Sequence, residues 1–170
     1  MDFAYLRQVL ATQADLIRTL LSDVSDAQAR WKPAPDRWSI LEVINHLYDE
    51  EREDFREHLD HILNRPDDGW HPISPMAWVT ERRYNERELA TSLDAFLAKR
   101  RASLAWLEGL GTPDWDASIP APWGAPLHAG DMFASWVVHG QWHIEQFIRL
   151  RRDWVIEQVK PYEVEYAGTL

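Results

Sequence analysis

Cysteine is absent from this chain of 170 residues, so no disulfide holds the fold together and no thiolate can act as a nucleophile or a metal ligand. A hydrophobic core must therefore stabilise the protein, and a metal site would have to be built from histidines and carboxylates. No run of about 18 apolar residues is present, which excludes a transmembrane helix and a membrane partner. Residues 1–7 lack the basic start and the apolar block of a signal peptide, and together these absences predict a cytoplasmic protein.

Basic residues are also scarce, because 18 Lys and Arg stand against 28 Asp and Glu and give a net charge of −10. A protein that binds a phosphate backbone needs a basic face. No stripe rich in Lys and Arg is found, so nucleic acid is not an expected partner. The acidic residues gather at Glu50, Glu51, Glu53 and Asp54, where we expect most of them to form the solvated flank of a helix. The length predicts one domain over residues 1–170.

Apolar residues at helical spacing are abundant. Four amphipathic helices are predicted, at about residues 2–22, 39–63, 85–108 and 128–154. Ser39, with Glu42 three residues later, predicts a capping box at the start of the second helix. The economical fold is all-α, an antiparallel four-helix bundle with long irregular loops between its helices. The connection after the second helix, about 20 residues long, is unusual for a compact domain and leaves room for a crossover. Residues 155–170 are predicted to form a C-terminal extended arm.

Two histidines, His139 and His143, lie one turn apart on the predicted last helix. Residues i and i+4 share one helix face, and two imidazoles placed in this way can hold one divalent metal ion. Gln146 lies on the same apolar stripe, where it could orient an imidazole or be a core amide bonded to a neighbouring helix. Because buried polar groups need partners, this set predicts a metal site.

His46, on the predicted second helix, is the candidate third ligand, because a catalytic metal usually takes three protein ligands and leaves a position for water. It lies at the edge of the apolar stripe, so spacing alone leaves a surface histidine equally open. Glu50, one turn later, could be a fourth ligand, a general base or a solvated residue. His58 and His61 lie among acidic residues, and we expect both on a solvated face.

Tryptophan is unusually frequent, with ten residues. Four of these lie in the two long loops, namely Trp70, Trp78, Trp115 and Trp123. They could plug the ends of the bundle, or they could line an apolar mouth above the metal, since ligand pockets are commonly aromatic.

Taken together and in order, these motifs resemble the DinB/YfiT-like superfamily. They are Trp38-Ser-Ile-x-Glu-Val-x-x-His46-Leu, followed far along the chain by His139-x-x-x-His143-x-x-Gln146. The resemblance covers about residues 3–152. It implies a four-helix bundle with a three-histidine site for a divalent metal, zinc or nickel, whose ligands are His46, His139 and His143.

The resemblance also implies the class of activity. Characterised relatives include thiol-dependent S-transferases and isomerases that use mycothiol, bacillithiol or glutathione, and many others are assigned only as metal-dependent hydrolases. A metal-dependent enzyme is therefore expected to act on a small-molecule substrate by hydrolysis or by transfer that uses a low-molecular-weight thiol, with water or a thiolate at the open metal position. The alternative is a non-catalytic bundle in which the metal only staples two helices and the tryptophan-rich loops bind an apolar ligand or a protein partner. The sequence does not identify catalytic residues.

A homodimer is expected for two reasons. Members of the family are often dimers, and the last predicted helix is also apolar opposite its histidines, at Phe133, Val137, Ile144 and Ile148. A helix with two apolar faces needs cover on both. A second subunit related by two-fold symmetry or the long loops of the same chain would provide it.

Overall fold

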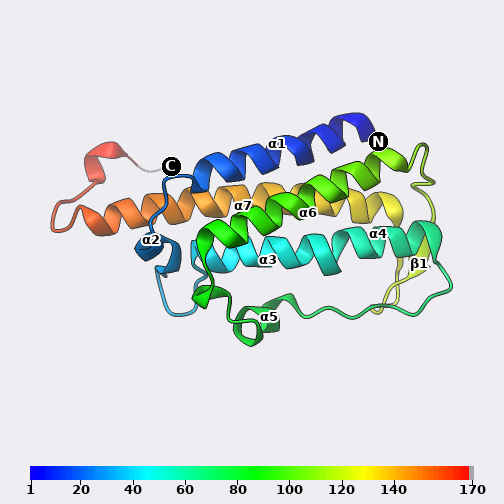
Figure 1. Cartoon of the computed structure of the whole chain (residues 1–170), viewed down its shortest axis with the longest axis horizontal. Coiled ribbons are helices and arrows are strands. Elements are labelled where there is room, and N and C mark those ends of the chain that lie inside the picture. Colours follow the sequence, from blue (N-terminus) through cyan, green and yellow to red (C-terminus); the bar gives the residue numbers. More distant parts are fainter. Residues whose placement is uncertain (169–170) are drawn as a thin grey trace.

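The structure, a computed structural model, describes residues 1–168, so the last two residues of the predicted arm lie outside it. Four long helical segments form a bundle (Figure 1), namely α1 (Phe3–Leu21), α3 (Ile40–Glu53) with its continuation α4 (Phe55–Asn64), α6 (Leu89–Gly109) and α7 (Ala129–Gln158). The short elements are α2 (Asp26–Arg30), α5 (Pro75–Glu81), the 3₁₀ turns η1 (Tyr84–Glu86) and η2 (Glu165–Ala167), and the hairpin strands β1 (Ser118–Pro120) and β2 (Pro126–His128). None of the helices in this described part is long and apolar enough to cross a membrane.

The order of the helices around the bundle is not a simple up-and-down sequence. α1 and α3 each pack against both α6 and α7. The colours of Figure 1 show that α1 and α7 run in one direction, whereas α3, α4 and α6 run in the other. The predicted four-helix bundle is therefore confirmed, with antiparallel packing of α1 on α6 and of α3 on α7. The long connection after α4 is a crossover, because it returns along the bundle before α6 begins (Figure 1).

Several predicted boundaries differ from the observed ones. The second predicted helix is broken at Asp54, whose φ of −118° and ψ of −94° are not helical. The prediction that the arm begins at residue 155 is wrong, because α7 continues to Gln158. The capping box is confirmed: the Glu42 amide donates to Ser39 Oγ at 3.1 Å, and the Ser39 amide donates to Glu42 Oε2 at 2.8 Å.

The face of α7 opposite the histidines is covered within the chain. Phe133, Val137 and Ile144 are buried, and α1 packs along α7. The Gln13 side-chain amide of α1 donates to the Val137 carbonyl at 2.8 Å. A second subunit is therefore not needed to cover these three residues. The alternative of cover by a long loop is found at Phe133, on which the loop residue Trp115 stacks. Ile148 alone of the four stays half exposed, at 53%.

The acidic segment is buried, so the prediction of a solvated flank is wrong. Glu50 and Glu51 are 4% and 3% exposed. The Glu51 carboxylate accepts from Arg100 Nε at 2.6 Å and from the Trp136 indole at 2.8 Å. Because α6 and α5 both pack on α3, they cover the side that the sequence pattern assigns to solvent.

Candidate metal centre

Three histidine side chains converge between α3 and α7. The Nε2 atom of His139 lies 3.3 Å from that of His46 and 3.1 Å from that of His143. One ligand atom from each residue lies within 4.8 Å of the others. The structure therefore brings together the three histidines that the sequence singles out.

Aromatic side chains hold the imidazoles in place. The ring of Trp38, which lies just before α3, packs edge-on to the His46 ring at 4.9 Å between centroids. Phe55, the first residue of α4, packs against His139, also at 4.9 Å. His46 is only 5% exposed, so the alternative of a surface histidine is excluded.

Gln146 fixes the tautomer of one imidazole. Its Oε1 atom lies 2.8 Å from His143 Nδ1, and because an amide oxygen only accepts, Nδ1 must carry the proton. The lone pair of His143 is then on Nε2, which faces the other two histidines. Of the two roles expected for Gln146, this contact supports orientation of the His143 imidazole rather than a bond to a neighbouring helix.

Glu50 lies behind His46. Its Oε1 atom is 3.6 Å from His46 Nδ1, on the opposite side of the ring from the Nε2 cluster. Neither atom has a hydrogen-bond partner among residues 1–168, so a small movement would join them. The interpretation of Glu50 as a solvated residue is wrong, and its position behind the ring does not favour a fourth ligand.

Burial keeps the titratable groups of the site neutral. Burial, together with the neighbouring histidines, lowers the pKa of His46 to about 2 and that of His139 to about 3, and burial also lowers the pKa of His143. Burial, together with Asp54, Asp49 and Glu51, raises the pKa of Glu50 to about 10. The imidazoles are therefore in the uncharged form that binds metals.

The donor set fits a divalent transition metal. Neutral imidazoles suit zinc, nickel, iron or copper. A tetrahedral zinc ion with Zn–N bonds of about 2.0–2.1 Å needs nitrogen atoms about 3.3 Å apart. The two Nε2 separations given above, 3.3 and 3.1 Å, are close to that value.

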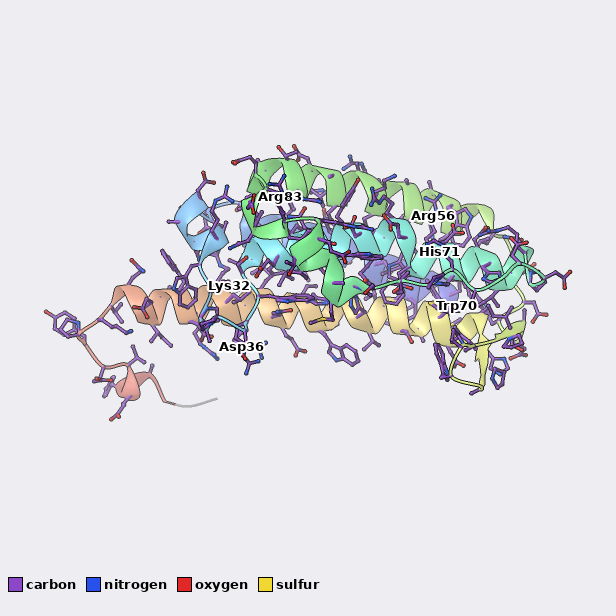
Figure 2. The ribbon with its side chains drawn as sticks, turned by 90° about the horizontal axis from the view of Figure 1, so that it is seen from below. Lys32, Asp36, Arg56, Trp70, His71 and Arg83 are labelled. Atoms are coloured by element: carbon purple, nitrogen blue, oxygen red, sulfur yellow. The ribbon has the colours of Figure 1, made fainter. Side chains whose placement is uncertain are left out.

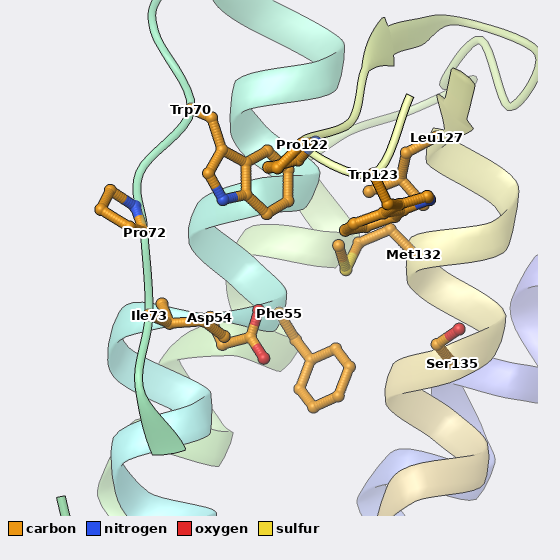
Figure 3. A pocket seen from close by; sticks show the side chains of 10 residues that line it. All are labelled: Asp54, Phe55, Trp70, Pro72, Ile73, Pro122, Trp123, Leu127, Met132 and Ser135. Carbon is orange, nitrogen blue, oxygen red and sulfur yellow. The ribbon is translucent and has the colours of Figure 1, made fainter. Parts of the chain in front are cut away.

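The cluster opens on one side into a cavity of about 430 Å³ lined by His139, Phe55, Ser135 and Trp142. A second cavity, of about 560 Å³, also has Phe55 and Ser135 in its wall and extends to Trp70 and Trp123 (Figure 3). Figure 2 shows that Trp70 lies toward the hairpin end of the bundle.

The loop tryptophans divide between packing at the end of the bundle and a cavity wall, but the cavity that two of them line includes none of the three histidines. Trp115 packs against Phe3 and Phe133 and closes one end of the bundle, and Trp78 is buried. Trp70 and Trp123, in contrast, line the larger cavity.

His58 and His61 are buried, at 0% and 4% exposure, so the prediction of a solvated face is wrong. His58 Nδ1 lies 2.7 Å from Asp54 Oδ1 and its Nε2 lies 2.9 Å from the His71 carbonyl. Burial lowers the pKa of His58, but these two acceptors outweigh it and the net pKa is raised. The contact between Asp54 and His58 could have been predicted from the sequence, because residues four apart share one face of a helix.

The fold and the cluster together define a helical-bundle protein with a candidate three-histidine metal centre. The sequence profile of the DinB superfamily matches residues 9–147, which is most of the chain, and the chain therefore belongs to the DinB superfamily.

Among solved structures, the chain is similar to YfiT from Bacillus subtilis, described as "a probable metal-dependent hydrolase with an unusual four-helix bundle topology". The TM-score is 0.78 at 17% sequence identity, over 88% of this chain and 86% of that one. At this identity the likeness concerns the fold. A comparison with curated proteins found no match.

Proposed function

We propose that this chain is a single-domain, metal-dependent enzyme in which His46, His139 and His143 hold one divalent metal ion, zinc or nickel. The observation that carries the proposal is the convergence of three uncharged imidazoles beside a cavity, with one ligand atom of each within 4.8 Å of the others. The description of YfiT as a probable metal-dependent hydrolase supports it. A bound divalent ion would supply Lewis acidity that activates water for hydrolysis or a small thiol for transfer.

The side chains around the histidines have separate tasks in this proposal. Gln146 and Glu50 face the Nδ1 atoms of His143 and His46 and orient the rings. Asp54, in contrast, lines the larger cavity. A small-molecule substrate in that cavity would therefore lie beside this carboxylate, which is held by His58.

One observation favours thiol-dependent transfer over hydrolysis. A polar cavity of about 300 Å³ is lined by Arg37 and Arg149 together with Trp38 and Gln146, the residues that contact His46 and His143. Two arginines suit the carboxylates of a low-molecular-weight thiol. Titration of the cobalt-substituted protein with glutathione should change its visible spectrum if a thiolate enters the site, and an unchanged spectrum leaves hydrolysis as the better candidate.

Metal content tests the proposal directly. Protein purified without a nickel column should carry close to one equivalent of divalent metal per chain. His139→Ala should abolish that binding without loss of helical content, because the site is local and the core is large. Gln146→Leu should weaken affinity by about 10–100-fold, since it removes the partner that orients His143. A wild-type protein that contains no metal and takes up neither zinc nor nickel would contradict the proposal.

The competing proposal is a non-catalytic protein in which the metal only cross-links α3 and α7. It predicts a closed coordination sphere and a metal-free protein that unfolds. Exchangeable water on the cobalt-substituted protein, together with a folded His139→Ala variant, would reject the competing function.

A further inference from the structure

The larger cavity has walls from distant parts of the sequence. The loop after α4 contributes Trp70 and Ile73, the hairpin contributes Trp123 and Leu127, and α7 contributes Met132 (Figure 3). Its volume of about 560 Å³ is within the range of small-molecule sites, about 300–1,000 Å³. The apolar character of these walls defines which chemical groups can fill it.

Two indole rings form a corner of the cavity. Their centroids are 5.9 Å apart and their planes meet at 79°. Trp70 is held rigidly, because its ring stacks on the fully buried His58 at 4.1 Å with an interplanar angle of 15°. His58 is in turn held by Asp54 and by the His71 carbonyl. A flat ring placed in this corner would meet the face of one indole and the edge of the other, both of which are favourable geometries.

The walls carry no free charge. Asp54 is the ionisable side chain that lines this cavity within residues 1–168, and its Oδ1 atom is already paired with His58 at 2.7 Å. An anionic group would find no arginine or lysine in the described lining, and burial of an unpaired charge is costly. An uncharged group is therefore the one that fits.

The cavity lies next to the smaller cavity beside the candidate metal centre. Phe55 and Ser135 line both cavities, and His139 lines the smaller one. Figure 3 shows Phe55 and Ser135 at the end of the cavity that lies away from Trp70 and Trp123. Phe55 and Ser135 thus form the wall of the larger cavity on the side of His139.

We propose that this cavity binds an uncharged aromatic group of the substrate and thereby selects the substrate class of the enzyme. The assignment of the bound molecule as a substrate rests on the proposed function. Binding of the ring itself does not require the metal, because none of the three histidines lines the larger cavity.

Equilibrium dialysis at pH 7 with 2-naphthol and with 2-naphthalenesulfonate tests the inference. The two probes share a flat ring system and differ in charge. 2-Naphthol should bind one molecule per chain, and the sulfonate should bind about tenfold more weakly. Trp123→Ala should weaken 2-naphthol binding by about tenfold, and Trp123→Phe should keep it within about threefold, because a flat apolar ring is restored.

Trp142→Ala is the matched control. Trp142 is 64% exposed, almost the same as Trp123 at 65%, but it lines the smaller cavity. The control should bind 2-naphthol within about threefold of wild type. Equal binding by wild type and Trp123→Ala, or a loss in Trp142→Ala alone, would overturn the inference.

His139→Ala separates the two proposals. This variant should still bind 2-naphthol within about threefold of wild type, whatever its metal content. If the wild-type protein binds metal but not 2-naphthol, the cavity inference alone is wrong. If it binds 2-naphthol but no metal, the proposed function alone is wrong.

Discussion

At the scale of single residues, the site combines buried groups of opposite titration behaviour. The pKa values of His46 and His139 are lowered by burial, and that of Glu50 is raised by burial. All three side chains are therefore uncharged near neutral pH in the metal-free protein. In the unfolded chain these groups have their ordinary pKa values. The free energy of unfolding should therefore fall when the pH is lowered, because of the histidines, and also when it is raised, because of Glu50.

The metal-free protein should accordingly be most stable near pH 6.5. The histidines bind fewer protons folded than unfolded, so their contribution is present above the ordinary pKa of 6.5 and is lost as pH falls toward about 3. Glu50 contributes below its ordinary pKa of 4.5, and that contribution is lost as pH rises toward about 10. His58, whose pKa is raised, adds to the loss above pH 6.5.

Urea unfolding of metal-free protein across this range measures the effect. Glu50→Gln keeps the shape of the side chain without its titration. It should reduce the decline in unfolding free energy above pH 6.5, steepen the rise between about pH 4.5 and 6.5, and leave the profile below pH 4.5 unchanged. An alkaline decline as steep in Glu50→Gln as in wild type would show that Glu50 is ionised in the folded protein.

The sequence predicted the site residues whose signal is local. The pair His139 and His143 follows from helical spacing, and so does Gln146. It did not predict burial of Glu50 or His58, because α5, α6 and the loop after α4 cover those side chains. When a polar side chain is buried by segments distant in the chain, the spacing of apolar residues in its own helix does not indicate that burial.

At the scale of the elements, α1 lies close against α7 at Gly140. A Cβ atom there would lie 2.3 Å from Gln13 Oε1 and 2.9 Å from Gln13 Cδ. Gln13 is only 1% exposed, and its amide donates to the Val137 carbonyl. The side chain therefore cannot move aside without loss of a buried hydrogen bond.

Gly140→Ala should destabilise the protein by about 1–3 kcal/mol through overpacking, although alanine favours a helix by about 1 kcal/mol. Gly109→Ala in α6 is the control, since a Cβ atom there meets nothing within 4 Å, and it should be neutral or stabilising. Chemical unfolding of both variants checks the prediction, which fails if Gly140→Ala is as stable as wild type.

Element boundaries show the same division between local and distant causes. The start of α3 was predictable because Ser39 and Glu42 form its capping box within four residues. The break at Asp54 was not, because no proline or glycine marks it. Asp54 instead hydrogen-bonds to His58 and lines the larger cavity. The cavity is formed with segments distant in the chain, so the local sequence does not indicate the break.

At the scale of the whole molecule, Arg100 joins three helices of the bundle. It is 1% exposed. Its Nε atom donates to Glu51 of α3 at 2.6 Å, and its Nη1 atom donates to the Leu10 carbonyl of α1 at 3.0 Å. Trp136 of α7 donates to the same Glu51 oxygen, so α7 is tied to this network as well.

Arg100→Met should cost about 3–5 kcal/mol, because it leaves the buried Glu51 carboxylate without its positively charged partner. The double variant Arg100→Met/Glu51→Leu should recover part of that loss. Arg18→Met, which breaks the exposed pair with Asp15, should change the free energy of unfolding by less than about 1 kcal/mol. A loss of that small size for Arg100→Met, measured by thermal or urea unfolding, would contradict the role of the buried pair.

The homodimer remains a prediction, and of the four residues first named for its interface only Ile148 is still a candidate. The outer side of α7 exposes Val138, Trp142, Ile148 and Val155 by 46%, 64%, 53% and 56%. Light scattering at micromolar concentration should give twice the single-chain mass of 19.9 kDa. A mass equal to that of one chain rejects the dimer. A cytoplasmic location likewise remains a prediction.

The hairpin and the loop after α4 stand outside the helix pairs that hold the histidines. An insertion, deletion or replacement in residues 65–74 or 118–128 would alter the cavity walls and leave the contacts of α3 with α7 in place. Mutation and selection could thus retarget this scaffold to new small molecules without rebuilding its metal centre. For protein engineering, these two segments are the place to randomise when a library is made on this bundle.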